Sequence, residues 1–502
     1  MTAKVDSYFE DLTASPDLGR LARRGGAASV AGVYGNGIIQ ILGVIILARL
    51  LTPEDFGLTA MVMVLMRFAP LLIDFGTADA TIQRSKITQG QVSTLFWLNT
   101  GIGFAVALGL AVCSPLIAWL YHEPRLEPVA MWSAITFVFT GISGQHLSLL
   151  RRSMQFVVIA KIQFLSALAG LALAILMAKS GYGYWALVLR QIVSAALFAV
   201  GAWLACSWRP GRLAFDAEVK SLVGFGMHVL GFSVVYHMTR VADRIALGLF
   251  YSPREVGYYQ NAHNMYENGF LGPIDQLHGV GSAGLSKLRS NPDALRQKFE
   301  ATLSALAFFV MPAAAILSVT GQDVTVAMLG EPWRKSGLLL SIVALRGVVE
   351  FIEVSGSWLH VSSGRADRWK NSGIASSAVR MVAILVSLPF GAEGVAVALV
   401  AAGWLIAFPS VIYAGQPLGI GAGLVVRAVR GPLLGAIIAL AAGWWLQTIF
   451  PSNFPILFQI LWSAFLCASL YLLIVVGLLR ITEPIKVAGR LVQDFGVRTA
   501  QR

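Results

Sequence analysis

The sequence predicts an all-α integral membrane protein with about 14 transmembrane helices. Two parallel-repeat six-helix lobes are expected, followed by two extra C-terminal helices. Three observations predict this fold class: a very apolar composition, a series of apolar runs of membrane length, and a segment that occurs twice. The 502 residues are 56% hydrophobic and only 13% charged, whereas soluble domains carry about 25% charged residues. The composition therefore excludes a soluble globular protein.

Apolar runs recur along the whole chain, and each is long enough to cross a hydrocarbon core of about 30 Å as a helix. Lipid offers no hydrogen bonds to the backbone, so helices that pair their backbone groups internally are the expected spanning elements. The predicted spans are 28–49, 56–76, 92–114, 129–150, 156–178, 183–206, 220–245, 256–283, 299–320, 336–360, 370–390, 393–414, 428–449 and 455–479.

The repeated segment reads LARLLTPEDFG at 47–57 and LGLFYSPREVG at 247–257. In each copy an apolar run arrives, a short corner containing proline, an acidic residue and glycine turns the chain, and another apolar run leaves. A second match, IDFGTADATIQRSK at 73–86 and IDQLHGVGSAGLSK at 274–287, has nearly the same offset and indicates a duplication. The corners follow the first and seventh spans, so both copies cross the membrane in the same direction. This is one of the repeat architectures of secondary transporters.

The charges predict the topology of the chain in the membrane. Most of the 38 Lys and Arg residues fall on one alternating set of connections, and cytoplasmic loops hold such an excess. Both termini are therefore predicted to be cytoplasmic, and the formal charge of +12 reflects topology rather than nucleic-acid binding. The longest outer loop is expected at 321–335, which leaves no room for an extracytoplasmic domain. The predicted parts are a cytoplasmic N-terminal segment at 1–27, an N-lobe at 28–206, a C-lobe at 220–414, two further spans at 428–479 and a cytoplasmic tail at 480–502.

Charged and polar residues inside the predicted spans are the candidates for a binding site. An Arg at the bilayer centre costs about 2.5–3.5 kcal/mol on insertion scales, so such residues normally face a cavity or a partner. In a cavity between the lobes, Arg suits phosphate oxygens because its planar guanidinium donates in pairs, and amide side chains suit sugar hydroxyls. The candidate substrate-binding residues are Arg67, Arg190, Arg240, Asn261, Asn264, Glu267, Arg346 and Arg380.

Four carboxylates are candidates for ion coupling. Glu350 and Glu353 follow Arg346 by four and seven residues, which places all three on one helix face. Asp74 and Asp275 occupy equivalent positions of the two repeats, where a hinge role is the competing interpretation. The alternative for the charged residues is that they neutralise one another between helices without contacting a ligand. No catalytic motif, metal-ligand spacing or cofactor motif occurs in the sequence.

Several stretches resemble a known family. They are ILARLLTPEDFGL with DFGTADATIQR, ADRIALGLFYSPREVGYYQNAHNM, and GYGYWALVLRQ at 181–191. They resemble the lipopolysaccharide and exopolysaccharide exporters, which are polysaccharide flippases of the multidrug/oligosaccharidyl-lipid/polysaccharide (MOP) superfamily. The resemblance covers about residues 25–415. Arg254 departs from the usual pattern of the family, and no ion site of the family matches residue by residue.

The resemblance implies two six-helix lobes around a cationic cavity. It also implies a flippase that moves a polyprenyl-diphosphate-linked oligosaccharide from the cytoplasmic to the outer leaflet of the bacterial inner membrane by alternating access. We therefore expect a transporter rather than an enzyme, which acts in lipopolysaccharide, exopolysaccharide or capsule biosynthesis. Its expected partners are the lipid-linked oligosaccharide, membrane lipids, and polysaccharide polymerase or export machinery, with no nucleic acid and the chain as a monomer.

Two alternative functions follow from the same residues. One is a small-molecule or multidrug exporter of the same superfamily. The other, from a different class, is a membrane polysaccharide polymerase or ligase, which needs a larger extracytoplasmic loop than the sequence provides. The sequence leaves open the identity of the glycan, the coupling ion and the direction of transport.

Overall fold

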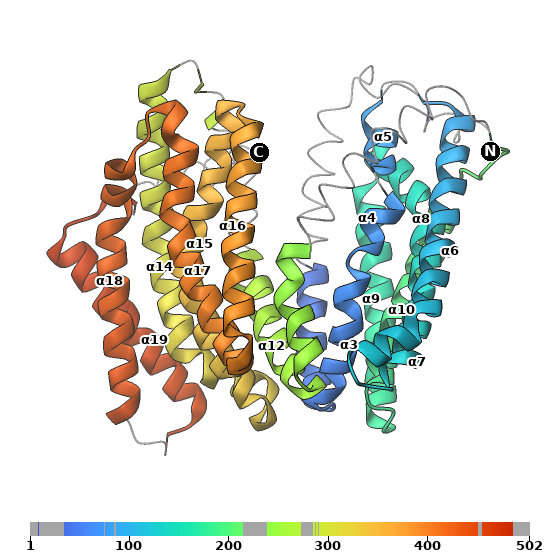
Figure 1. Ribbon diagram of the computed structural model, residues 1–502, viewed down its shortest axis with the longest axis horizontal. Helices are drawn as coiled ribbons and strands as arrows, with labels where there is room; N and C mark the ends of the chain where they lie inside the picture. The colour runs from blue at the N-terminus through green and yellow to red at the C-terminus, as the bar shows by residue number, and fades with distance from the viewer. Residues whose placement is uncertain are drawn as a thin grey trace, which may run out of the picture. The chain divides into compact units, whose positions relative to one another are not determined.

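The computed structural model describes residues 9, 35–74, 76–84, 87–213, 238–272, 285–286, 288–289, 291–449 and 454–484. Within these residues every regular element is a helix, which confirms the all-α fold class (Figure 1). The chain divides into two compact units, Met1–Gly257 and Tyr258–Arg502.

The first unit is a bundle of helices around two apolar clusters. A helix at Gly35–Ala48 opens it, and residues 238–250 form another helix near its end. α6 packs along α7 and α8, and α10 packs along α8 and α9 (Figure 1). The labelled helices are α3 (Pro53–Met66), α4 (Ala69–Asp74), α5 (Thr77–Gln83), α6 (Gln89–Leu120), α7 (Leu126–Ser133), α8 (Ile135–Arg152), α9 (Phe156–Lys179) and α10 (Trp185–Ala205).

The second unit is built around α15, which packs against both α14 and α17 (Figure 1). α16 packs against α17, whereas α18 and α19 pack against α14. The helices are α12 (Pro253–Tyr266, which begins in the first unit), α14 (Pro292–Leu329), α15 (Arg334–Ser363), α16 (Ala366–Ser387), α17 (Gly391–Gly415), α18 (Ala422–Ile449) and α19 (Ile456–Leu472). Two π-helical turns, η2 (Glu267–Leu271) and η6 (Leu473–Leu478), extend α12 and α19.

The chain is a multi-pass membrane protein. Nine helical stretches among the described residues are long and apolar enough to cross a membrane, one of which combines α16 and α17. Large apolar side chains such as Leu108, Leu204 and Leu461 are exposed on the helices, as expected where the surrounding solvent is lipid. Each predicted span contains helix in its described residues. The total of 14 crossings stays a prediction.

The duplicated corner forms a helical hairpin in both copies. Thr52 caps α3, because its hydroxyl accepts from the Asp55 backbone N–H at 3.3 Å while the Asp55 carboxylate accepts from the Thr52 N–H at 2.9 Å. Pro53 then occupies the first helical position, where its missing N–H costs nothing. Arg125 donates to Glu54 at 2.6 Å and to Glu123 at 2.8 Å, which ties the start of α3 to the turn after α6 and lowers the pKa of Glu123.

The two corners also contact each other. A Cβ atom added to Gly57 would lie 1.7 Å from the carbonyl oxygen of Pro253, and one added to Gly257 would lie 1.9 Å from that of Pro53. All four residues belong to the first unit. Glycine is needed at both positions because the helix backbones approach too closely for any side chain. The sequence repeat is thus also a reciprocal, symmetric contact.

The helix at 56–76 is interrupted, as the proline within this span suggests. α3 ends at Met66 and α4 begins at Ala69, so the break falls at Arg67 and Phe68. Pro70 has no N–H to donate to the Met66 carbonyl, and its ring would clash with that group in a regular helix. Pro70 therefore accounts for the break between α3 and α4.

The expected outer loop at 321–335 is wrong. α14 continues to Leu329, a 3₁₀ turn covers Glu331–Trp333, and α15 begins at Arg334. Thr325 and Leu329 are buried on this helix and stabilise its last turns, so α14 continues through the start of the expected loop. At 38 residues, α14 is about 57 Å long.

Candidate functional site

Two ion pairs lie on α15 in the second unit. Within the helix, Arg346 Nη2 lies 2.6 Å from Glu350 Oε1. Between helices, Arg380 Nη2 on α16 lies 2.7 and 2.5 Å from the two carboxylate oxygens of Glu353. The side chains are only 9–23% exposed, so little solvent competes for these charges. The structure therefore brings four of the predicted site residues together as two neutral pairs.

Tyr266 on α12 completes the first pair. Its fully buried hydroxyl donates to Glu350 Oε2 at 2.6 Å, so Glu350 accepts hydrogen bonds from Arg346 and Tyr266 together. The Tyr266 ring stacks on Phe270, with ring centroids 5.5 Å apart. Phe270 lies against Gly347, where an added Cβ would come within 2.5 Å of the ring. Tyr266 is not among the predicted site residues, although it lies in the polar stretch that contains Asn261 and Glu267.

Helix α17 supports the Arg346 side chain from behind. A Cβ on Gly403 would lie 3.2 Å from Arg346 Cγ, so the glycine leaves room for the arginine stem. Trp404, the next residue, donates to the Leu345 carbonyl at 3.2 Å and fixes α17 against α15. The two Arg and two Glu charges cancel. Each pair uses one guanidinium nitrogen, Nη2, so a ligand with two anionic groups would compete with the two carboxylates for the guanidinium groups.

The polar residues predicted on and just after α12 lie close to Tyr266 in the sequence, and they differ in their contacts. Asn261 is 2% exposed, and neither atom of its amide has a hydrogen-bond partner among the described residues. A buried amide without a partner is uncommon and is satisfied when water or a ligand binds. Asn264 accepts from Gln260 at 2.7 Å, and Glu267 Oε1 lies 3.2 Å from His263 Nε2.

The candidates of the first unit have other surroundings. Arg190 on α10 donates to Gln40 Oε1 at 2.7 Å. Arg67, which caps the C-terminus of α3, and Arg240 are exposed. Asp74 accepts from the Thr77 hydroxyl at 3.1 Å and from the Ala78 N–H at 2.8 Å, so it stabilises the start of α5. Asp275 lies outside the described residues.

A second polar cluster in the first unit was not predicted. Thr81 donates to Gln145 at 2.9 Å, and Thr77 hydrogen-bonds the Asn99 amide. Arg152 is 5% exposed and donates to the carbonyl oxygens of Thr81 and Arg84 at 3.1 and 2.5 Å. This cluster joins the short helix α5 to α6 and α8. Arg152 lies at the end of a predicted span, where basic residues are usually exposed, so the sequence contains no signal that it is buried.

The described residues contain no group of three His, Cys, Asp or Glu side chains that could hold a metal ion. The side chains of the α12, α15 and α16 cluster supply guanidinium, carboxylate, phenol and amide groups. These groups can bind anions and exchange protons.

Comparison with known proteins assigns the family. The model of the family described as "Polysaccharide biosynthesis protein" matches residues 46–337, more than half of the chain. The chain belongs to this family.

Two relatives are similar in sequence to this polysaccharide biosynthesis protein. "Lipopolysaccharide biosynthesis protein WzxC" of Escherichia coli (strain K12) is 25% identical, over 67% of this chain and 68% of the relative. "Teichuronic acid biosynthesis protein TuaB" of Bacillus subtilis (strain 168) is 26% identical, over 66% of this chain and 69% of the relative.

Two solved structures share the fold. "Lipid II flippase MurJ, inward closed conformation" has a TM-score of 0.70 and 14% identity, and the match covers 90% of this chain and 98% of that one. An inward-facing multidrug resistance MATE family transporter of the MOP superfamily has a TM-score of 0.56 and 11% identity, over 76% and 94% of the two chains. The chain therefore shares the fold of these two proteins, as the sequence resemblance implied.

Proposed function

We propose that the chain is a flippase for surface polysaccharide biosynthesis. It translocates a polyprenyl-diphosphate-linked oligosaccharide from the cytoplasmic to the outer leaflet of a bacterial inner membrane by alternating access. The family match over residues 46–337 is the observation that carries this proposal. The names of the relatives support a polysaccharide pathway, and the fold shared with a lipid II flippase supports a lipid-linked cargo. Both termini are cytoplasmic in this proposal.

Arg346 and Arg380 bind the diphosphate of the substrate. Each guanidinium is already held by a carboxylate, at 2.6 Å in one pair and 2.5 Å in the other. A diphosphate carries at least two negative charges and accepts bidentate hydrogen bonds from arginine. It therefore replaces Glu350 and Glu353 as the partner of the two arginines, and the pairs re-form when the substrate leaves.

The displaced carboxylates provide a route for coupling to protons. An ionised carboxylate that loses its partner in a poorly solvated site is destabilised, so it tends to take up a proton. Glu350 and Glu353 are protonated while the substrate is bound and release their protons when the arginines return. Tyr266 positions Glu350 through the 2.6 Å hydrogen bond. The amides of Asn261 and Asn264 bind sugar hydroxyls.

The remaining candidates have supporting roles in the proposal. Arg67, Arg190 and Arg240 attract the anionic head group of the substrate. Glu267 is paired with His263 until a sugar hydroxyl takes the place of His263. Asp74 and Asp275 act at the hinges of the two repeats, and the capping of α5 by Asp74 supports this role.

Substitution of the arginines tests the binding role. We expect Arg346→Gln and Arg380→Gln to lower flipping at least tenfold, because the neutral amide cannot pair with phosphate. Flipping is measured on protein in lipid vesicles, as the loss of a polyprenyl-diphosphate-linked oligosaccharide from one leaflet. Arg365→Gln is the matched control, since Arg365 also pairs with a carboxylate but is 52% exposed. Wild-type flipping by both variants would overturn the assignment.

The carboxylates are tested by the dependence of flipping on pH. Glutamine cannot exchange a proton, so Glu350→Gln and Glu353→Gln should abolish the stimulation of flipping by a pH gradient across the vesicle membrane. The basal rate without a gradient serves as the internal control. If both variants retain the full stimulation, flipping is not coupled to protons through these carboxylates.

A multidrug exporter is the second candidate, supported by the MATE-like fold at a TM-score of 0.56. The two functions differ in their cargo. A drug exporter protects cells against toxic organic cations, whereas a flippase restores surface polysaccharide to cells that lack it. The Arg–Glu cluster is neutral and offers groups to either charge, so the family match is what favours the polysaccharide cargo.

A further inference from the structure

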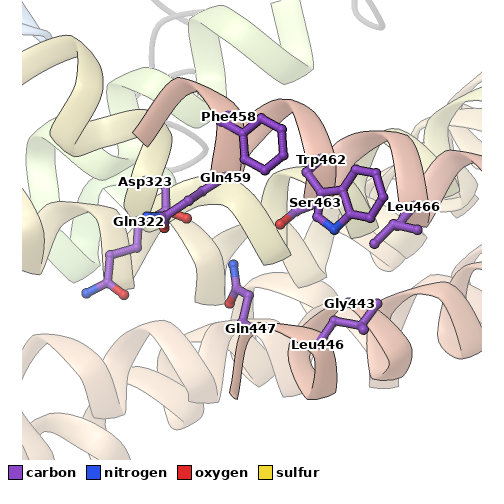
Figure 2. Close-up of a pocket in the computed structure, with 10 residues that line it drawn as sticks. All are labelled: Gln322, Asp323, Gly443, Leu446, Gln447, Phe458, Gln459, Trp462, Ser463 and Leu466. Carbon is purple, nitrogen blue, oxygen red and sulfur yellow. The ribbon is translucent and has the colours of Figure 1, made fainter. Parts of the chain in front are cut away.

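A pocket of about 200 Å³ lies between α14, α18 and α19 in the second unit, away in sequence from the Arg–Glu pairs (Figure 2). α14 contributes Gln322 and Asp323 near its C-terminal end. α18 contributes residues 443–447, and α19 contributes Phe458, Gln459, Trp462, Ser463 and Leu466. The helices that close this pocket are the two that follow the duplicated part of the chain.

Asp323 gives the pocket its charge. It is the only charged residue in the lining, and it makes no hydrogen bond or ion pair with a described residue. Arg334 acts on it electrostatically, but the Arg334 guanidinium is already bonded to both oxygens of Glu331 at 2.6 and 3.0 Å. Among the described residues Asp323 therefore has no directly bonded counter-ion, and a cation that enters the pocket can pair with it.

The other lining groups indicate which cation fits. The Phe458 and Trp462 rings stack on α19 with centroids 6.1 Å apart and an angle of 8° between them, and they present aromatic faces that attract an ammonium group. The Ser463 hydroxyl and the Gln459 and Gln447 amides also reach the pocket (Figure 2). The nitrogens of both amides are occupied, because Gln447 donates to the Val319 carbonyl at 2.6 Å and Gln459 to the Phe454 carbonyl at 2.8 Å. Their carbonyl oxygens remain as acceptors for a hydrogen-bond donor.

The position of the pocket indicates where the cation comes from. Its aromatic wall reaches the surface of the helices, since Phe458 and Trp462 both line the pocket and are 44% and 36% exposed. Trp residues gather at the level of the lipid head groups. A carboxylate beside an exposed aromatic wall therefore suits a lipid head group better than an acyl chain.

We propose that this pocket binds the primary ammonium of a zwitterionic phospholipid head group. The ammonium donates to Asp323 and to the glutamine oxygens, and it lies against the Trp462 face. The bound lipid holds α18 and α19 against α14. This site is independent of the flippase function.

Native mass spectrometry of the full-length protein in detergent tests the proposal. Titration with phosphatidylethanolamine should give tighter binding than titration with phosphatidylglycerol, which has no ammonium. Asp323→Asn should weaken phosphatidylethanolamine binding at least fivefold, and so should Trp462→Leu. Glu300→Gln is the matched control, because Glu300 is also a partly exposed carboxylate on α14, paired with Arg427 at its other end. This control should bind the lipid as the wild type does.

Three results would overturn the proposal. Equal binding of the two lipids would show that the ammonium is not recognised. Wild-type binding by both Asp323→Asn and Trp462→Leu would place the lipid elsewhere. Saturation of the site by soluble phosphoethanolamine without any binding of the phospholipid would show that the source is a free amine and not the membrane. Thermal unfolding of each variant identifies any that fails to fold, and the two substitutions act on different helices.

Discussion

Arg380 shows how a charged residue in a membrane helix is matched to its partner. The chain around it holds no opposite charge within one helical turn, and its partner Glu353 lies 27 residues earlier on another helix. The structure joins them because an isolated charge among apolar helices is costly. Arg346 and Glu350, four residues apart on one helix, could be paired from the sequence alone, and the structure shows that pair at 2.6 Å.

A double-mutant cycle measures how strongly Arg380 and Glu353 interact. We expect Arg380→Gln and Glu353→Gln each to destabilise the protein, because each leaves one charge without its partner. The double variant should recover part of the loss, with a coupling of about 0.5–3 kcal/mol. The free energy of unfolding is measured in mixed micelles with increasing denaturant. Additive losses would mean that the contact contributes no stability.

Tyr266 and Arg152 make contacts that could not be predicted from each residue and its neighbours in the sequence. Tyr266 belongs to a polar helix in which several residues are plausible ligands, and only the packing of α12 against α15 selects it as the partner of Glu350. Arg152 ends an apolar helix as many cytoplasmic arginines do, yet it is buried against the C-terminus of α5. Both contacts join segments far apart in the chain, so the local sequence pattern does not predict them.

At the level of elements, the duplicated corner is the feature that sequence and structure share most closely. The repeat predicted two equivalent hairpins, and the structure shows a hairpin in each copy. Their direct contact was not predicted, because similarity between two segments does not imply that they touch. The contact explains why each corner ends in glycine, since Gly57 and Gly257 each face the proline carbonyl of the other corner.

Gly57→Ala and Gly257→Ala should therefore destabilise the protein. The added Cβ atoms would lie 1.7 and 1.9 Å from carbonyl oxygens, and overpacking of this kind costs about 1–3 kcal/mol or more. Thermal unfolding in detergent measures the effect. Gly101→Ala on α6 is the control, because an added Cβ has nothing within 4 Å there and alanine favours a helix by about 0.5–1 kcal/mol. Equal midpoints for Gly57→Ala and Gly101→Ala would contradict the close contact.

The elements also show where local polarity misleads. Gln322 and Asp323 fall in the loop expected after the ninth predicted span, but they are on α14 and line the pocket formed with α18 and α19. A helix satisfies its own backbone whatever its side chains are, so a polar residue near a membrane surface ends a helix only if it competes for those backbone groups. Neither residue does so here.

At the level of the whole molecule, the distribution of Lys and Arg predicts about 14 crossings with both termini in the cytoplasm. Single cysteines test this in a variant whose native cysteines are replaced by serine. Lys179→Cys and Glu331→Cys should react with a membrane-impermeant maleimide added to intact cells, and Arg209→Cys and Arg365→Cys should react only after permeabilisation. Labelling of the second pair in intact cells would refute the topology.

The sequence by itself determined the membrane class, the positions of most helices, the duplication and the family. These follow from properties that act along the chain: the free energy of moving each residue into lipid, the helical hydrogen bonds to nearby residues, and the identity of repeated segments. The tertiary structure decided which charges are paired, that Tyr266 joins Glu350, that the two corners touch, and that Asp323 lies in a pocket. Such contacts depend on distances between segments remote in sequence, and several partners are chemically equivalent until packing selects one.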